Sequence, residues 1–244
     1  HFARTAINKT GTGYHQHSAA AHLNTLTAYY GCVDWVDDAV GRILETLEYL
    51  GLAENTIVVY TTDHGEMGGE HGTWQKTLFY EASARVPLAV RWPGTWTGGR
   101  RCRDIVGLHD LFPTLCAAAG IDTPETCDGV SLTPLLDDSG PLGRDAVFSE
   151  STVLKHPEHA GCMIRTGNWK YSLYLDGEAE LYDLDTDPGE LDNLSGRAEF
   201  ADLECGLRKR VEDFWEPDQQ MSRFERTPQM SREKHFYKFS NQFI

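Results

Sequence analysis

A carboxylate, an imidazole and an ammonium group lie close together in the sequence, at Asp63, His64 and Lys76. The apolar run before them, residues 56–60, predicts a buried strand of a parallel sheet. Ligands bind at the carboxyl ends of such strands, and the glycines between residues 65 and 72 allow neighbouring side chains to turn toward one cation. A metal held there, with Lys76 as a nearby positive charge, suits an anionic sulfate or phosphate ester.

The elements expected around this segment are those of an α/β sheet. Apolar residues at helical spacing predict a long amphipathic helix over residues 26–50, which we expect to pack on a face of the sheet. A strand at 56–62, a helical turn at 77–83 and a second strand at 86–92 follow in that order. This succession indicates a parallel sheet with crossover connections.

The second half of the chain contains shorter elements. Asp110 is placed to cap a helix that ends at Gly120. Beyond it, two short alternating strands meet at a turn over residues 166–168, a third strand follows, and residues 201–215 predict a final amphipathic helix. This pattern predicts a small antiparallel sheet covered by one helix.

These elements divide the chain into three parts. Residues 1–150 are expected to form part of an α/β domain with the glycine-rich loop, and residues 151–216 a small C-terminal subdomain. The tail at 217–244 mixes aromatic and charged residues without a clear period. We expect the tail to contact another domain or subunit, for example a second copy in a homo-oligomer.

Several stretches together resemble the type I sulfatases of the alkaline phosphatase superfamily. The segment DHGEMGGEHG, with Trp74 and Lys76 after it, is similar to the second metal-binding segment of that family. Further similarities follow in the same order over roughly residues 25–215, at 81–88, 110–115, 128–132, 163–171 and 180–184. The resemblance implies a mostly parallel sheet flanked by helices, with a small antiparallel sheet and a helix at the C-terminal end.

The resemblance also implies roles for individual residues. Asp63 and His64 correspond to metal ligands, and Lys76 to the lysine that touches the sulfate and offsets charge in the transition state. His71 is expected either to contact the substrate near the leaving-group oxygen or to brace the loop. Calcium is the metal that the family generally uses, although an imidazole ligand suits manganese or zinc better.

One part of the family pattern is absent from this sequence. Sulfatases carry a C/S-x-P/A-x-R motif, whose first residue matures to the formylglycine nucleophile, and no Cys or Ser of this chain begins such a motif. The first metal-binding segment of the family is also absent, and the sequence begins at His1. We therefore expect the N-terminal part of the same enzyme, with the formylglycine, to be the partner of this chain.

Composition excludes some functions and leaves others open. A net charge of −15 disfavours nucleic acid, and no apolar run approaches the roughly 18 residues of a membrane span. The run Arg100-Arg101-Cys102-Arg103 could attract a sulfated polymer, but a solvated loop is the simpler interpretation. Two alternatives to a sulfatase remain: a phosphonate monoester or phosphodiester hydrolase on the same scaffold, and a non-catalytic remnant that serves in binding or assembly.

Overall fold

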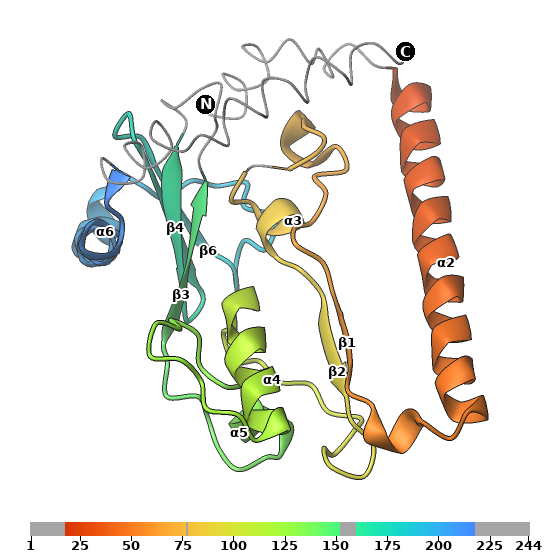
Figure 1. Ribbon diagram of the computed structural model, residues 1–244. Helices are drawn as coiled ribbons and strands as arrows, with labels where there is room; N and C mark the ends of the chain where they lie inside the picture. The colour runs from red at the N-terminus through yellow and green to blue at the C-terminus, as the bar shows by residue number, and fades with distance from the viewer. Residues whose placement is uncertain (1–17, 77, 152–159, 218–244) are drawn as a thin grey trace, which may run out of the picture. The chain divides into compact units, whose positions relative to one another are not determined.

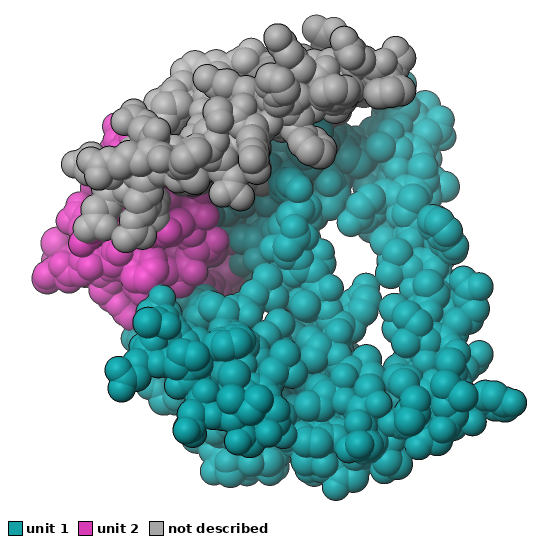
Figure 2. All heavy atoms as spheres, viewed as in Figure 1, with its two compact units in different colours: residues 1–147 teal, residues 148–244 magenta. Residues whose placement is uncertain are grey.

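The computed structural model describes residues 18–76, 78–151 and 160–217. The chain divides into two compact units, residues 1–147 and 148–244 (Figure 2). All but the first residue of the tail predicted at 217–244 lies outside the described residues. None of the helices in the described ranges has the length and apolar character needed to cross a bilayer.

The first unit contains one long helix, a two-stranded sheet and several short helices (Figure 1). Its elements are α2 (Ala19–Tyr49), η2 (Ala53–Asn55), β1 (Val58–Thr61), η3 (Glu70–Gly72), α3 (Glu81–Ala84), β2 (Leu88–Arg91), η4 (Leu108–Asp110), α4 (Leu111–Ala119) and α5 (Thr133–Leu136). As predicted, α4 ends at Gly120, which adopts the left-handed conformation with a φ of 67°.

The two strands of this unit are antiparallel, which corrects the parallel arrangement predicted for them. Val58 pairs with Arg91 and Thr61 with Leu88. A parallel pair needs a crossover that returns the chain to the starting edge of the sheet. The segment between β1 and β2 contains only the short η3 and α3, so the chain turns back at the end of β1 and β2 begins there.

The predicted packing of the long helix on the sheet is also wrong for the described residues. No residue of α2 is buried, and Val33, Val36 and Ile43 are 45%, 47% and 59% exposed. The helix touches its unit near its two ends, where the His22 ring lies against Gly69 and Glu48 pairs with Arg91 at 2.6 Å. Two strands of four residues offer too small a face to cover a helix of 31 residues.

The second unit contains the predicted small antiparallel sheet and its helix. Its elements are β3 (Ala146–Ser151), β4 (Gly161–Thr166), β5 (Trp169–Tyr174), β6 (Ala179–Asp183), η6 (Ala198–Phe200) and α6 (Ala201–Phe214), and the strand order is β3-β4-β5-β6. Thr166 pairs with Trp169 across a two-residue turn, in which Gly167 has a φ of 52°. Ile164, Tyr171, Leu181 and Val211 are fully buried between this sheet and α6.

A buried ion pair lies inside this second unit. Lys170 Nζ is 2.8 Å from Glu190 Oε1, and the side chains are only 1% and 3% exposed. An unpaired charge at either position would cost several kcal/mol of desolvation, so each residue requires the other. The pair fixes β5 to the segment that follows β6.

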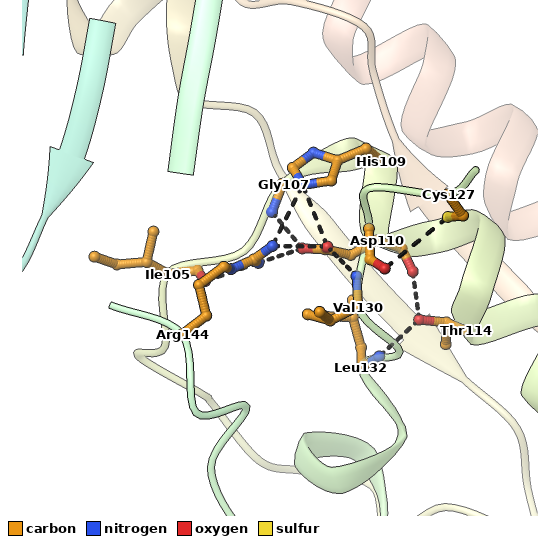
Figure 3. A network of polar contacts seen from close by, with 10 residues as sticks. Ile105, Gly107, His109, Asp110, Thr114, Cys127, Val130, Leu132 and Arg144 are labelled. Carbon is orange, nitrogen blue, oxygen red and sulfur yellow. Dashed lines mark hydrogen bonds and ion pairs between the residues drawn. The ribbon is translucent and has the colours of Figure 1, made fainter. Parts of the chain in front are cut away.

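Asp110 does not cap α4, contrary to the prediction, but is the centre of a buried network (Figure 3). Its carboxylate accepts hydrogen bonds from the backbone N–H of Gly107 at 2.8 Å and of Val130 at 3.0 Å. Arg144 donates two more, at 2.9 and 2.5 Å, and the Asp110 side chain is fully buried. The Asp110 carboxylate faces the turn before the helix. The hydrogen bonds from Arg144 and two backbone N–H groups stabilise it more than the single hydrogen bond of a helix cap would.

The network sets the protonation of Asp110. Burial raises the pKa of the carboxyl group, but the hydrogen bonds from Arg144 and from the two backbone N–H groups, together with nearby His109, hold it below its ordinary value of 3.8. The folded state therefore favours the carboxylate more strongly than the unfolded chain does. This contribution to stability is complete above the ordinary pKa and is lost as the pH falls through the lowered one.

We predict that Asp110→Asn lowers the free energy of unfolding by about 3–5 kcal/mol at neutral pH, because Arg144 is left buried without its counter-ion. The wild-type protein should lose part of this difference as the pH falls below about 4, because the carboxyl group of the unfolded chain takes up a proton before that of the folded protein. Urea unfolding at a series of pH values measures both effects. Asp122→Asn, at an exposed position, is the control; equal stability of the two variants at neutral pH would contradict the role of the network.

Candidate functional site

The candidate site lies in the loop between β1 and β2, which is fastened at its base by hydrogen bonds. Thr61 Oγ1 donates to the carbonyl of Pro87 at 2.8 Å, and the Gly65 N–H donates to the carbonyl of Ser83 at 2.8 Å. A Cβ at residue 65 would lie 2.0 Å from the carbonyl oxygen of Ala82, so only glycine fits there. The close packing at the base of the loop therefore requires glycine directly after His64.

Glu66 organises the interior of the loop. Its Oε1 accepts hydrogen bonds from the backbone N–H of Gly68 at 3.2 Å and of Gln75 at 2.5 Å. Met67 is 1% exposed, and its N–H donates to the Gln75 carbonyl at 2.8 Å. These bonds bring residue 75, and with it Lys76, back to the end of β1.

The three residues predicted to act together converge in the structure. Lys76 Nζ is 2.6 Å from His64 Nε2, and His64 Nε2 is 3.5 Å from Asp63 Oδ2. The side chains of Asp63 and His64 are 83% and 37% exposed. The carboxylate, the imidazole and the ammonium thus form one accessible cluster where β1 ends.

The hydrogen bonds of His64 determine which of its nitrogens faces the cluster as an acceptor. Its Nδ1 lies 2.8 Å from the Gly65 carbonyl, and a carbonyl oxygen only accepts, so Nδ1 carries the proton. Nε2 then presents its lone pair to the Lys76 ammonium. An Nδ1–H donated to a backbone carbonyl is the arrangement usual for histidines that bind metals through Nε2.

The cluster favours the charged form of Asp63. Desolvation raises the pKa of this carboxyl group, but His64, the backbone N–H of Asp63, the Thr62 hydroxyl and Lys76 outweigh it and lower the pKa below 3.8. Asp63 is therefore a carboxylate at neutral pH. A carboxylate oxygen and an imidazole lone pair 3.5 Å apart suit two positions in the coordination shell of one divalent cation.

The described residues contain two of these donors but not a complete shell. No group of three or more His, Cys, Asp or Glu side chains in residues 18–76, 78–151 and 160–217 is arranged to hold a metal ion. Structural and catalytic metal sites generally use three or more protein ligands. Asp63 and His64 therefore suit a metal site that is completed by further ligands.

His71 lies apart from the cluster in its contacts. Its ring stacks on Tyr80 with centroids 3.7 Å apart and planes inclined by 7°, and its backbone is left-handed with a φ of 51°. Within the described part of the chain it makes no hydrogen bond with Asp63, His64 or Lys76. The stacking braces the loop against the residue that precedes α3.

Other contacts around the loop were partly predictable. Arg85 pairs with Glu81 one helical turn away, at 3.9 Å, as the spacing suggests. The edge of the His22 ring meets Trp74, with centroids 5.2 Å apart, although His22 is far away in the sequence. His22 precedes the helix predicted at 26–50, so no pattern in the sequence suggested this contact. The loop-forming role of Glu66 was not predicted, and the surrounding glycines were the one available signal.

The family model described as "Sulfatase" matches residues 2–121, and the model described as "N-sulphoglucosamine sulphohydrolase, C-terminal" matches residues 69–216. The two matches overlap across the loop and together extend over most of the chain. The chain belongs to the type I sulfatases of the alkaline phosphatase superfamily.

Individual sulfatases and their structural relatives agree with this assignment. Arylsulfatase K of Rattus norvegicus is 36% identical over an alignment of 236 residues, which covers 91% of this chain and 38% of the relative. A protein solved in complex with its substrate D-glucosamine-2-N,6-O-disulfate is 34% identical, with a TM-score of 0.70, over 75% of this chain and 38% of that one. The chain thus spans less than half the length of these relatives.

A second solved relative has a different name. The phosphonate monoester hydrolase of Agrobacterium radiobacter is 33% identical, with a TM-score of 0.70, over 76% of this chain and 40% of that one. The α/β fold class predicted from the sequence is confirmed by these structural relatives. The sulfatase scaffold therefore includes proteins named for sulfur and for phosphorus chemistry.

Proposed function

We propose that this sulfatase chain contributes to the metal-dependent hydrolysis of a sulfate ester. The observation that carries the proposal is the convergence of Asp63, His64 and Lys76 at the end of β1. Asp63 and His64 would hold the metal as part of a larger set of ligands. Lys76 would bind the sulfate oxygens.

In this proposal Asp63 and His64 bind the metal, and Lys76 binds the substrate. A bound divalent cation supplies a Lewis acid that polarises the ester oxygens and orients the nucleophile. His64 has one lone pair on Nε2, so a ligand role for His64 removes the acceptor that Lys76 now contacts. The Lys76 ammonium is then free for an anionic oxygen, and it offsets the negative charge that grows there in the transition state.

Two components of the proposed reaction lie outside this chain. The formylglycine nucleophile is expected in the N-terminal part of the enzyme, because no Cys or Ser here begins the required motif. The remaining metal ligands are expected from the same part. Calcium is the metal we propose first, with manganese or zinc as alternatives that suit the imidazole of His64.

The substrate we propose is a sulfated sugar. A relative 34% identical to this chain was solved with a disulfated glucosamine, and the model that matches residues 69–216 is named for a sulphoglucosamine sulphohydrolase. The accessible position of Asp63 and His64 leaves room for a ligand larger than the sulfate group. A smaller sulfate ester would meet the same charged cluster.

A phosphonate monoester hydrolase is the second candidate, because a protein of that name is 33% identical to this chain. A tetrahedral anion of either element would meet the same cation and ammonium group. Assays of the full-length protein with nitrophenyl sulfate and with a nitrophenyl phosphonate monoester separate the two. Faster turnover of the phosphonate, in kcat/KM, would overturn the sulfatase proposal, and no turnover of either ester would favour a non-catalytic remnant.

The exposed side of α2 supports the proposal that the rest of the enzyme covers this chain. Val33, Val36 and Ile43 are about half exposed at helical spacing, as on a helix that lacks its neighbour. The β1–β2 pair has only two strands, and such a pair is rarely stable by itself in water. Further strands from the N-terminal part would extend this sheet and pack on α2.

We predict that Lys76→Ala in the full-length protein lowers kcat by about 10²–10³, because one donor to the transition-state charge is lost. Steady-state kinetics with nitrophenyl sulfate measures the change, and circular dichroism checks the fold. Lys209→Ala is the matched control, because Lys209 pairs with Asp213 on the surface of α6. A kcat within twofold of the wild type would remove Lys76 from the reaction.

We predict that Asp63→Ala in the full-length protein loses the bound metal, because the remaining ligands include one fewer anionic donor. Elemental analysis after dialysis gives the metal content per chain. Asp122→Ala, at an exposed position away from the loop, should keep the metal of the wild type. Stoichiometric metal in the Asp63 variant would show that this carboxylate is not a ligand.

We predict that Ile43→Asp lowers the stability of the full-length protein by about 2–5 kcal/mol, because a charge would replace an apolar side chain under the covering part. Denaturant unfolding measures the change. Glu45→Ala, on the same helix, is the control. Ile43 is 59% exposed in this chain, so stability equal to that of the control would mean that nothing covers this side of α2.

A further inference from the structure

A second region of the first unit combines a hollow with a concentration of positive charge. The hollow has a volume of about 580 Å³ and lies between residues 100–104 and the neighbourhood of α5. Arg100 closes one side, where it pairs with Asp138 at 2.8 Å and donates to the carbonyl of Leu135. These bonds hold residues 100–104 against α5, so the hollow is a feature of the folded unit.

Two arginines at this hollow stand out from the other arginines of the protein. Arg101 and Arg103 are exposed, and within the described ranges they are the arginines with no hydrogen bond or ion pair. Every other arginine in those ranges contacts a carboxylate, a hydroxyl group or a backbone carbonyl. In a chain with a net charge of −15, two unpaired arginines only two residues apart in the sequence are unusual.

The charge of the hollow is positive after its acidic residues are counted. Arg100 balances the negative charge of Asp138. Asp104 is then the remaining carboxylate at the hollow to balance the positive charges of Arg101 and Arg103. A guanidinium group binds sulfate or phosphate oxygens through paired N–H donors, and an unpaired one has no competing partner to give up. The hollow therefore favours anions, while the surrounding protein repels them.

The hollow is distinct from the cluster at Asp63. β1 leads into that cluster at Thr61, which pairs with the first residue of β2, Leu88. β2 runs away from it and ends at Arg91, opposite the start of β1. The chain reaches Arg100 only after leaving β2 at this far end, and the hollow is lined by none of the residues of the Asp63 loop.

We propose that the hollow at Arg101 and Arg103 is a second binding site, which holds sulfate groups of an anionic oligosaccharide away from the reaction site. The choice of a sulfated sugar rests on the function proposed above, whereas the preference for anions rests on the hollow itself. Such a site would retain a polymeric substrate between successive encounters with the cluster at Asp63, so its effect grows with the length of the sugar chain.

Cys102 provides a direct measurement, since it is an exposed cysteine outside any disulfide, it lies between the two arginines in the sequence, and its thiol makes only a long contact of 3.8 Å with the carbonyl of Leu135. The rate of alkylation of Cys102 in the full-length protein is followed by peptide mass spectrometry, with and without a heparin hexasaccharide. We expect saturating hexasaccharide to slow alkylation of Cys102 several-fold and to leave Cys205, another exposed free thiol, unchanged. Equal slowing at both cysteines, or none at Cys102, would overturn the proposal.

Substitutions separate this site from the reaction site. In Arg101→Gln/Arg103→Gln, we expect the hexasaccharide concentration that half-protects Cys102 to rise about tenfold, whereas Arg197→Gln, which removes a charge paired with Asp192, should not change it. Protection retained in the double variant would overturn the proposal. Lys76→Ala should keep the protection of Cys102, so a failure of the proposed reaction and a failure of this site give different results.

Discussion

The closure of the loop between β1 and β2 is the constraint on which the candidate site depends. Thr61 and Leu88 pair where the loop begins and ends, and Gly65 lies so close to the Ala82 carbonyl that no side chain fits. Glu66 then folds the chain back to Gln75. Each step restricts where Lys76 can lie relative to His64, so the cluster of Asp63, His64 and Lys76 results from hydrogen bonds made elsewhere in the loop.

Much of this arrangement could be predicted from the sequence. The apolar residues before Asp63, the glycines after it and the order of the later motifs indicate the strand, the loop and the family. The turn at Gly167 and the inner face of α6 at Leu207 and Val211 also follow from local patterns, because residue type and spacing directly determine a hairpin and an amphipathic helix. The meeting of Asp63, His64 and Lys76 is the strongest agreement at the site.

The features that could not be predicted depend on distant partners. The direction of β2 is set by how the loop returns, and periodicity within the strand carries no sign of it. The carboxylate of Asp110 has a local role available as a helix cap, but Arg144, far along the chain, draws it into a buried network. The apolar side of α2 predicts a helix packed on a sheet, whereas the described residues provide too few strands to cover it.

The short connections of the second sheet have a consequence for how the protein folds. β4 and β5 are joined by the two-residue turn at Gly167, and β5 and β6 by a turn closed by the Gly177 N–H on the Tyr174 carbonyl at 2.9 Å. Contacts between residues near in sequence cost little chain entropy to form, and such topologies fold rapidly. This three-stranded meander can therefore assemble early and act as a nucleus onto which α6 later docks.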